Sequence, residues 1–306
     1  MPRDTQHLPD ETKAALRALA KIGTVHMPDE AEEPILAPAV RQAVFAWLYE
    51  INATDELKAV GLKPRRSALL YGPPGCGKTT LAHHLAARLG IPMVVVGSES
   101  IVTAYLGESS QNIAKLFDAL AKIETPVLLF LDEIDAIGSR RKDERGGGAQ
   151  DERNAMLTVL MRKLEVSTCF TVAATNRADA LDPALWRRFD MQISVDLPTE
   201  DERFAILRRY SAPFRLAETA VDTLTAQTMG ASPALLRGLM ESMKRALILG
   251  PRIHQPTGDP VALFARLAAA IAPPPEIEPP PLWETKAAGL AGIPWPPTRE
   301  ESEEKS

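Results

Sequence analysis

The stretch GPPGCGKTT, residues 72–80, follows the apolar run SALLY and precedes LAHHLAARLG. It fits the pattern G-x-x-x-x-G-K-[ST] with Gly72, Gly77, Lys78 and Thr79, between a predicted strand and a predicted helix. Glycines allow successive backbone N–H groups to turn towards an anion, and the helix that begins at Lys78 points its positive dipole end at the same place. We therefore interpret the stretch as a loop that binds the phosphates of a nucleotide. The alternative is a glycine-rich turn that only connects a strand to a helix.

The residues expected to contact the nucleotide are Gly72, Pro73, Pro74, Gly75, Cys76, Gly77, Lys78, Thr79 and Thr80. A second apolar strand, VLLFLDE, ends in Asp132 and Glu133. We expect the Thr79 hydroxyl and Asp132 to hold Mg²⁺, and Glu133 to orient and polarise the water that attacks the γ-phosphate. The alternative is a pair of ordinary exposed acids at a strand end. Asp135, in the same DEID run, could equally make a structural contact to a neighbouring subunit.

Two further segments are candidates for the same site. FTVAATNR ends a predicted strand with Asn176, whose amide could bridge the attacking water and the γ-phosphate, although asparagine is common where strands end. LDPALWRRFD presents Arg187 and Arg188, and an arginine can neutralise the charge that develops on phosphate oxygens in the transition state. The alternative for these arginines is a surface ion pair with Asp190 or Glu200.

The composition describes an ordinary globular protein. The chain has 306 residues, a length with room for about two domains. Of these residues 45% are hydrophobic and 25% are charged, which is usual for a globular protein. Its net charge of −5 argues against a protein that mainly binds nucleic acid. No apolar run approaches the roughly 20 residues that span a bilayer, and no signal-peptide pattern opens the chain, so we expect a cytoplasmic protein without a membrane partner. Cys76 and Cys169 are expected to be free thiols.

Apolar and amphipathic segments alternate from about residue 35 to 198, which predicts an α/β fold with a parallel sheet and flanking helices. We expect an N-terminal helical and acidic extension over 1–34 and a small helical domain over 199–272. Residues 273–306 hold nine prolines and end in EESEEKS, so we expect a disordered tail.

In order and spacing, these motifs resemble the AAA ATPases over roughly residues 35–250. GPPGCGKTT resembles the family's Walker A motif, VLLFLDEIDAI its Walker B motif, and ATNRADALDPALWRRFD its second region of homology. The resemblance implies a P-loop NTPase domain with a helical lid that binds ATP and Mg²⁺. It also implies a hexameric ring, with Asn176 as the sensor and Arg187 and Arg188 as arginine fingers that reach a neighbour's site.

The sequence departs from the family pattern at three places. RRFD stands where many members have R-x-G-R-F-D, so separate roles for the two arginines are not assigned. The lid segment MGASPALLRGL has Pro233 and Leu235 where glycine and aspartate are usual. No clear match to the family's adenine-contacting motif precedes the phosphate loop, and base contacts are expected near Ile35 and Leu36.

The segment ESIVTAYLGESSQNI contains Tyr105, Leu106 and Gly107, which match the family loop that lines the central pore and pulls a polypeptide through it. An exposed aromatic side chain can grip many kinds of side chain without reading their sequence. The alternative is that Tyr105 and Leu106 belong to the core. The charged, glycine-rich loop 139–153 could line the same pore or be solvated.

Three functions remain open at this point. The first is an ATPase that unfolds, translocates or remodels a protein substrate. The second is a nucleic-acid motor or loader on the same fold, and the third is a nucleotide-gated scaffold. The tail, with Trp283 and Trp295 among its prolines, is a candidate docking segment for an effector such as a separate protease, or a passive solubilising tail.

Overall fold

The computed structural model describes residues 17, 20–21, 23–102, 108–124, 126–139, 148–273 and 278–299. In the helix that begins at residue 148, the side chains are described from residue 152 onwards. Tyr105, Leu106 and Gly107 lie outside the described residues. The chain divides into two compact units at Val195 and Asp196, and the short segments Ile35–Ala37 and Pro74–Cys76 group with the second unit. Within the described part of the chain, no helix has the length and apolar character needed to cross a membrane.

The first unit is built on a six-stranded sheet with the order β1-β3-β4-β5-β2-β6. Only the edge strand β1 runs antiparallel to its neighbour. The strands are β1 (Thr24–His26), β2 (Ser67–Tyr71), β3 (Met93–Val96), β4 (Leu128–Leu131), β5 (Phe170–Thr175) and β6 (Met191–Ser194). All four residues of β4 are buried, as expected for a central strand of a parallel sheet covered on both faces. The predicted α/β fold is confirmed.

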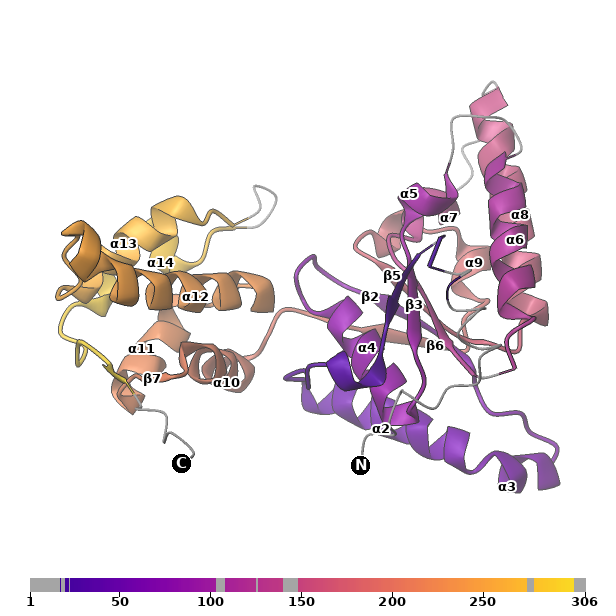
Figure 1. Ribbon diagram of the computed structural model, residues 1–306, viewed down its shortest axis with the longest axis horizontal. Helices are drawn as coiled ribbons and strands as arrows, with labels where there is room; N and C mark the ends of the chain where they lie inside the picture. The colour runs from indigo at the N-terminus through magenta and orange to yellow at the C-terminus, as the bar shows by residue number, and fades with distance from the viewer. Residues whose placement is uncertain are drawn as a thin grey trace. The chain divides into compact units, whose positions relative to one another are not determined.

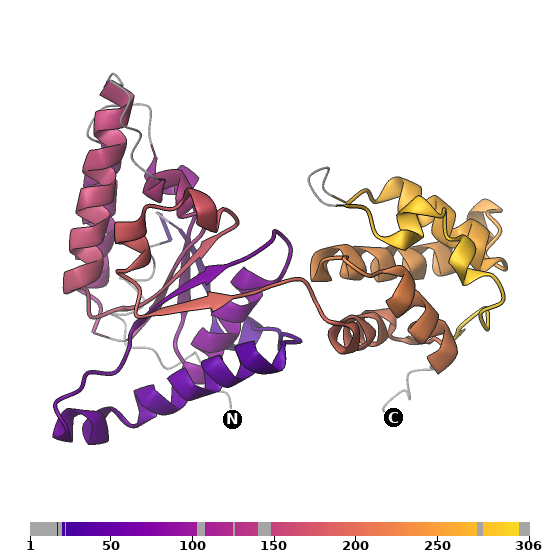
Figure 2. The ribbon, with the colours of Figure 1, turned by 180° about the vertical axis from the view of Figure 1, so that it is seen from behind.

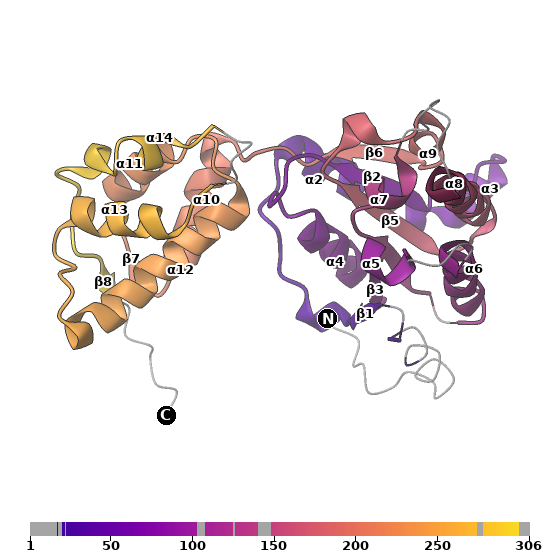
Figure 3. The same ribbon diagram turned by 90° about the horizontal axis from the view of Figure 1, so that it is seen from above.

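Helices cover both faces of this sheet (Figures 1 and 3). Helices α6 (Glu108–Leu120) and α8 (Gly148–Val166) lie side by side on one face, and α4 (Lys78–Leu89) packs on the other, against α2 (Pro38–Asn52). Figure 2 shows α2, in purple, near the edge strand β6. The shorter elements are η2 (Pro28–Glu30), α3 (Thr54–Ala59), α5 (Ser98–Ile101), α7 (Asp135–Gly138), η3 (Ala178–Ala180) and α9 (Pro183–Trp186).

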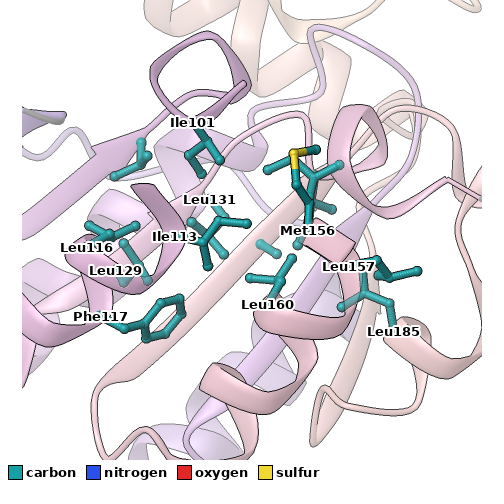
Figure 4. Close-up of a cluster of buried hydrophobic side chains, with 14 of the residues drawn as sticks. Ile101, Ile113, Leu116, Phe117, Leu129, Leu131, Met156, Leu157, Leu160 and Leu185 are labelled. Carbon is teal, nitrogen blue, oxygen red and sulfur yellow. The ribbon is translucent and has the colours of Figure 1, made fainter. Parts of the chain in front are cut away.

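The core between the sheet and helices α6 and α8 is shown in Figure 4. Leu129 and Leu131 of β4 meet Ile113 and Leu116 of α6 in this cluster, and Leu160 of α8 is fully buried beside them. Alternate residues of a strand point to opposite faces, so Leu128 and Phe130 face the other helix layer. This packing on two faces holds the ends of the central strands in fixed positions.

The sequence predicts that region 1–34 is an extension outside the α/β domain. Its described part instead contributes β1, which pairs with β3 through Thr24 opposite Val95 and His26 opposite Met93. His83 of α4 also contacts the Met27 carbonyl oxygen through Nε2, at 2.8 Å. This segment is therefore an edge of the sheet.

The second unit is mainly helical. Its helices are α10 (Glu200–Ser211), α11 (Glu218–Gln227), α12 (Pro233–Leu249) and α13 (Pro260–Ala270), with the short η4 (Gly250–Ile253). Thr199 and Glu202 form a capping box at the start of α10, and Ser232 caps α12. The apolar faces of these helices share one core, which contains Leu207, Leu236 and Phe264.

The prediction of a disordered tail over 273–306 is wrong for its described residues 278–299, which are folded. Residues 278–299 form α14 (Pro281–Glu284), η5 (Ala288–Leu290) and β8 (Thr298–Arg299), and Leu282, Ala287 and Leu290 are fully buried in the core of the helical unit. The indole N–H of Trp283 donates to the Ile271 carbonyl at 2.6 Å. The Trp295 indole donates to the Thr257 carbonyl at 2.7 Å and lies edge-on to Phe264. The prolines thus shape an extended strap whose apolar residues complete an existing core.

Candidate functional site

The loop after β2 has the backbone that its glycines predict. Gly72 has φ 145°, and a Cβ there would lie 2.2 Å from the Val195 carbonyl oxygen, which excludes any other residue without backbone movement. Gly77 has φ 87° and open space around its Cβ position, and it immediately precedes α4. Left-handed backbone of this kind is readily adopted only by glycine. The chain therefore turns sharply into the N-terminus of a helix of 12 residues.

Lys78 begins α4, and its side chain turns back over the loop. Its Nζ donates to the carbonyl oxygens of Gly72 and Pro73, both at 2.8 Å, and the residue is 8% exposed. Thr79 is exposed and Thr80 is half-buried in the first turn of the same helix, which contains no acidic residue. A buried ammonium, open glycine backbone and a helix N-terminus without acids fit a polyphosphate, because each favours negative charge.

The acidic pair lies at the end of β4. The Asp132 N–H donates to the Val96 carbonyl at 3.0 Å, and the Asp132 carboxylate accepts the Glu133 N–H at 2.9 Å. Glu133 is exposed, and the Ser98 hydroxyl lies 3.5 Å from its Oε2. Its φ of 50° is left-handed, an unfavourable conformation for a residue with a side chain. The strain is located at the residue expected to activate water.

Strand register brings the predicted groups to one edge of the sheet. Strand β5 lies between β2 and β4, with Thr175 opposite Tyr71 and Ala173 opposite Leu131. The strands are parallel, so the residues that follow their carboxyl ends emerge at the same edge. Gly72, Asp132 and Asn176 are the residues that follow β2, β4 and β5. Asn176 is exposed there.

Sequence reasoning missed the role of Thr175. The buried Thr175 hydroxyl donates to Oδ1 of Asp135 at 2.6 Å and accepts the Arg177 N–H at 2.9 Å. A second bond, from the Ile134 N–H to the Ala174 carbonyl at 3.0 Å, joins the same two segments. A threonine that ends a mostly apolar strand was the available signal. Asp135 therefore has a hydrogen-bond partner within its own chain.

The two candidate arginines follow the short helix α9, which Asp182 caps by accepting the Ala184 N–H. Arg187 and Arg188 are both exposed. Arg188 forms an ion pair with Glu165 of α8 at 3.3 Å.

Neither alternative acid considered for these arginines is the partner of Arg188. One of them, Asp190, accepts hydrogen bonds from the N–H groups of Arg66 and Ser67 and from the Ser67 hydroxyl. The finger roles of Arg187 and Arg188 stay predictions.

Neither cysteine forms a disulfide, as expected. Cys76 is buried within the phosphate loop, and Cys169 precedes β5. Burial raises the pKa of the Cys169 thiol to about 11, although a backbone hydrogen bond and Arg66 oppose that rise. A thiol with this pKa stays protonated near neutral pH and is a weak nucleophile.

Comparison with known proteins supports the resemblance to the AAA ATPases for the α/β unit. Residues 68–197 match the model of the ATPase family associated with various cellular activities (AAA). A proteasome-activating nucleotidase of Pyrococcus horikoshii is 42% identical over 187 residues, which cover 59% of this chain and 46% of that protein.

Two further relatives are each 38% identical. They are the ATP-dependent zinc metalloprotease FtsH 1 of Conexibacter woesei, with 60% of this chain and 29% of that protein covered, and the 26S proteasome regulatory subunit 6A of Saccharomyces cerevisiae, with 56% and 41% covered. The matched region thus spans less than half of each of these relatives. With the Walker-type loop, the acidic strand end and the sheet order described above, residues 68–197 form a domain of the AAA family.

Proposed function

We propose that this chain binds ATP with Mg²⁺ and hydrolyses it at the edge of the sheet where β2, β4 and β5 end. The observation that carries the proposal is the strand register that brings Gly72, Asp132 and Asn176 to one edge. Lys78 and the N-terminus of α4 bind the phosphates, and Glu133 orients and polarises the attacking water. Asn176 positions that water relative to the γ-phosphate.

Thr79 and Asp132 are the residues that would hold Mg²⁺, the first by its hydroxyl and the second through water. When bound, the metal neutralises charge on the phosphate oxygens. Both residues come from the ends of elements fixed by the core, since Thr79 lies in the first turn of α4 and Asp132 directly follows the buried strand β4.

We further propose that hydrolysis unfolds, translocates or remodels a protein substrate in the pore of a hexameric ring, with Arg187 and Arg188 reaching the ATP of a neighbouring subunit. The names of the relatives, a proteasome-activating nucleotidase and a subunit of the 26S proteasome, support a protein substrate. Tyr105, Leu106 and Gly107 are the proposed pore residues. In this proposal the ring works in the cytoplasm.

A separate protease is the proposed effector, because the relatives are named for the proteasome or for a metalloprotease. The sequence makes the tail a candidate docking segment for this effector, with the two tryptophans as anchors. The indoles of Trp283 and Trp295 are engaged in the helical unit, so these side chains do not serve as anchors for a partner. Contact with the effector would use exposed residues.

The experiment is a trap with Glu133→Gln, which keeps the shape of the side chain and removes its charge. We expect this variant to bind ATP with unchanged affinity and to hydrolyse it at least about 100-fold more slowly. Substrates captured by the ATP-bound variant are then identified by mass spectrometry. An unchanged hydrolysis rate would falsify the role of Glu133.

The substrate class is tested separately on the unmodified chain. Unfolded casein should raise ATP turnover, and Tyr105→Ala should remove that stimulation while leaving the basal rate unchanged. Tyr105→Phe, which keeps the aromatic ring, is the matched control. Stimulation by single-stranded DNA and not by casein would reject the protein substrate in favour of a nucleic-acid motor.

A further inference from the structure

The helical unit has a groove of about 390 Å³ at the junction of α10, α11 and the short strand β7 (Phe214–Arg215). Phe204, Pro213 and Phe214 contribute apolar rings to its lining. Arg208 and Arg215 also line it and are both exposed, and Glu218 is the one acid among the lining residues that the structure describes. A groove with apolar rings and two guanidinium groups suits an extended peptide that carries carboxylates.

The strand β8 (Thr298–Arg299) lies beside β7, both residues of which line this groove. It pairs antiparallel with β7, with Thr298 opposite Arg215 and Arg299 opposite Phe214. The chain of β8 therefore runs towards Pro213 and Ala212, which line the groove. Adjacent Cα atoms are about 3.8 Å apart, so the residue after Arg299 starts beside the groove. Figure 3 labels both strands within the helical unit.

The sequence that follows β8 is complementary in charge to the groove. Residues 300–306 read EESEEKS, with four glutamates and one lysine, and lie outside the described residues. The described lining of the groove contains two arginines and one glutamate. The segment is tethered at Arg299, so its concentration at the groove is on the order of millimolar, and weak charge-assisted hydrogen bonds suffice for occupancy.

We propose that residues 300–306 bind the groove of their own helical unit through carboxylate contacts to Arg208 and Arg215. The segment then extends the strap that begins at α14 and ends at β8, and it keeps other acidic peptides out of the groove. The inference rests on the second unit alone and is independent of ATP hydrolysis.

The test attaches a fluorophore to Ser306→Cys in the full chain with Cys169→Ala, and measures the amplitude of fast anisotropy decay. We expect Arg208→Glu with Arg215→Glu to raise this amplitude about twofold or more, because the tether alone no longer holds the segment. Replacement of the four glutamates by glutamine should do the same. Arg252→Glu, an exposed arginine in the same unit, is the matched control and should have no effect.

A charge swap separates binding from an effect on folding. Glu301→Lys with Glu303→Lys, added to the Arg208→Glu and Arg215→Glu variant, should restore the original low amplitude. The same amplitude of fast anisotropy decay in all variants, whether high or low, overturns the proposal. So does restraint that disappears on dilution, because that result assigns the groove to the segment of another copy.

Discussion

The Thr175 hydroxyl donates a 2.6 Å hydrogen bond to Oδ1 of Asp135, and this bond joins the end of β5 to the segment after β4. Each end of the bond lies close in sequence to a residue of the proposed site. Asn176 directly follows Thr175, and Glu133 lies two positions before Asp135. Thr175 is only 1% exposed, so this bond is shielded from water. It therefore fixes the spacing between the proposed water-activating acid and the proposed sensor.

Replacing Thr175 by valine keeps the shape of the side chain and removes the hydroxyl. We expect the free energy of unfolding of the first unit to fall by about 1–3 kcal/mol, because the Asp135 carboxylate and the Arg177 N–H each lose a partner. ATP turnover should fall with it, since Asn176 is no longer held. Thr175→Ser, which keeps the donor, is the control and should retain most of the turnover. Equal turnover in the valine variant and the unmodified chain would refute the positioning role.

The left-handed backbone of Glu133 predicts an unusual order of stability among its variants. Glycine adopts φ 50° without the steric cost that a Cβ imposes, so Glu133→Gly should be more stable than Glu133→Ala by about 1 kcal/mol. At an ordinary position the order is the reverse. Both variants lack the carboxylate and should hydrolyse ATP slowly. Urea unfolding of the two variants measures the difference, and a more stable alanine variant would show that the strain is absent.

Arg187 can be tested for action on a neighbouring subunit by mixing two inactive variants. Arg187→Ala should lower ATP turnover by about 1,000-fold with little effect on ATP affinity. Mixed with Glu133→Gln, it should regain turnover, because some sites then combine an intact Glu133 with an intact Arg187 from the next subunit. A mixture no more active than its components would contradict action across an interface.

The pair between Arg188 and Glu165 calls for a separate variant. An exposed ion pair contributes about 0–1 kcal/mol, which is too little to prevent Arg188 from turning to another partner. Glu165→Gln should therefore leave turnover unchanged or slightly higher, while Arg188→Ala lowers it. If Glu165→Gln lowers turnover as much as Arg188→Ala does, the ion pair itself is what matters.

The strap of residues 278–299 should be needed for the stability of the helical unit. Leu282→Ala removes a fully buried side chain and should cost about 2–5 kcal/mol. Leu249→Ala, at a side chain that is 46% exposed, is the control and should change stability little. Thermal unfolding followed by circular dichroism compares the two. Equal midpoints would mean that the strap is dispensable.

The sequence was informative where one local pattern determines the structure. Apolar runs such as SALLY and VLLF predicted buried parallel strands, and the glycines at 72 and 77 predicted the turn into α4. The strap was missed because prolines recur along it and an acidic run, EESEEKS, follows it. Leu282 and Leu290 are separated along it without a regular period, so no helix or strand pattern reveals that they are buried.

Contacts between distant segments were also beyond the reach of the sequence. The partner of Arg188 is Glu165 of helix α8. The acids considered from the sequence, Asp190 and Glu200, are closer to Arg188 along the chain. The pairing of β1 with β3 joins two segments about 70 residues apart, and a strand of three residues has little pattern of its own. Local spacing predicted the candidate residues of the proposed site, whereas the contacts that hold them come from packing between distant segments.

The last prediction concerns pH and His84, on the helix that begins at the phosphate loop. Burial, and secondarily the charge of Arg88, lower the pKa of His84 below 6.5, while Glu33 opposes the shift. A histidine with a lowered pKa binds its proton more readily in the unfolded chain than in the folded one. Its contribution to stability is therefore fully present above pH 6.5 and is lost as the pH falls through the lower folded value.

We expect the melting temperature to fall between pH 7.5 and 5.5, and His84→Gln to reduce that fall, because glutamine does not titrate. His26→Gln is the matched control, since His26 lies on the edge strand β1 outside α4. If the slope of melting temperature against pH is the same in His84→Gln as in the unmodified chain, protonation of His84 does not destabilise the fold. A reduced slope in His84→Gln alone would locate the acid sensitivity on the helix whose N-terminus binds the phosphates in the proposed site.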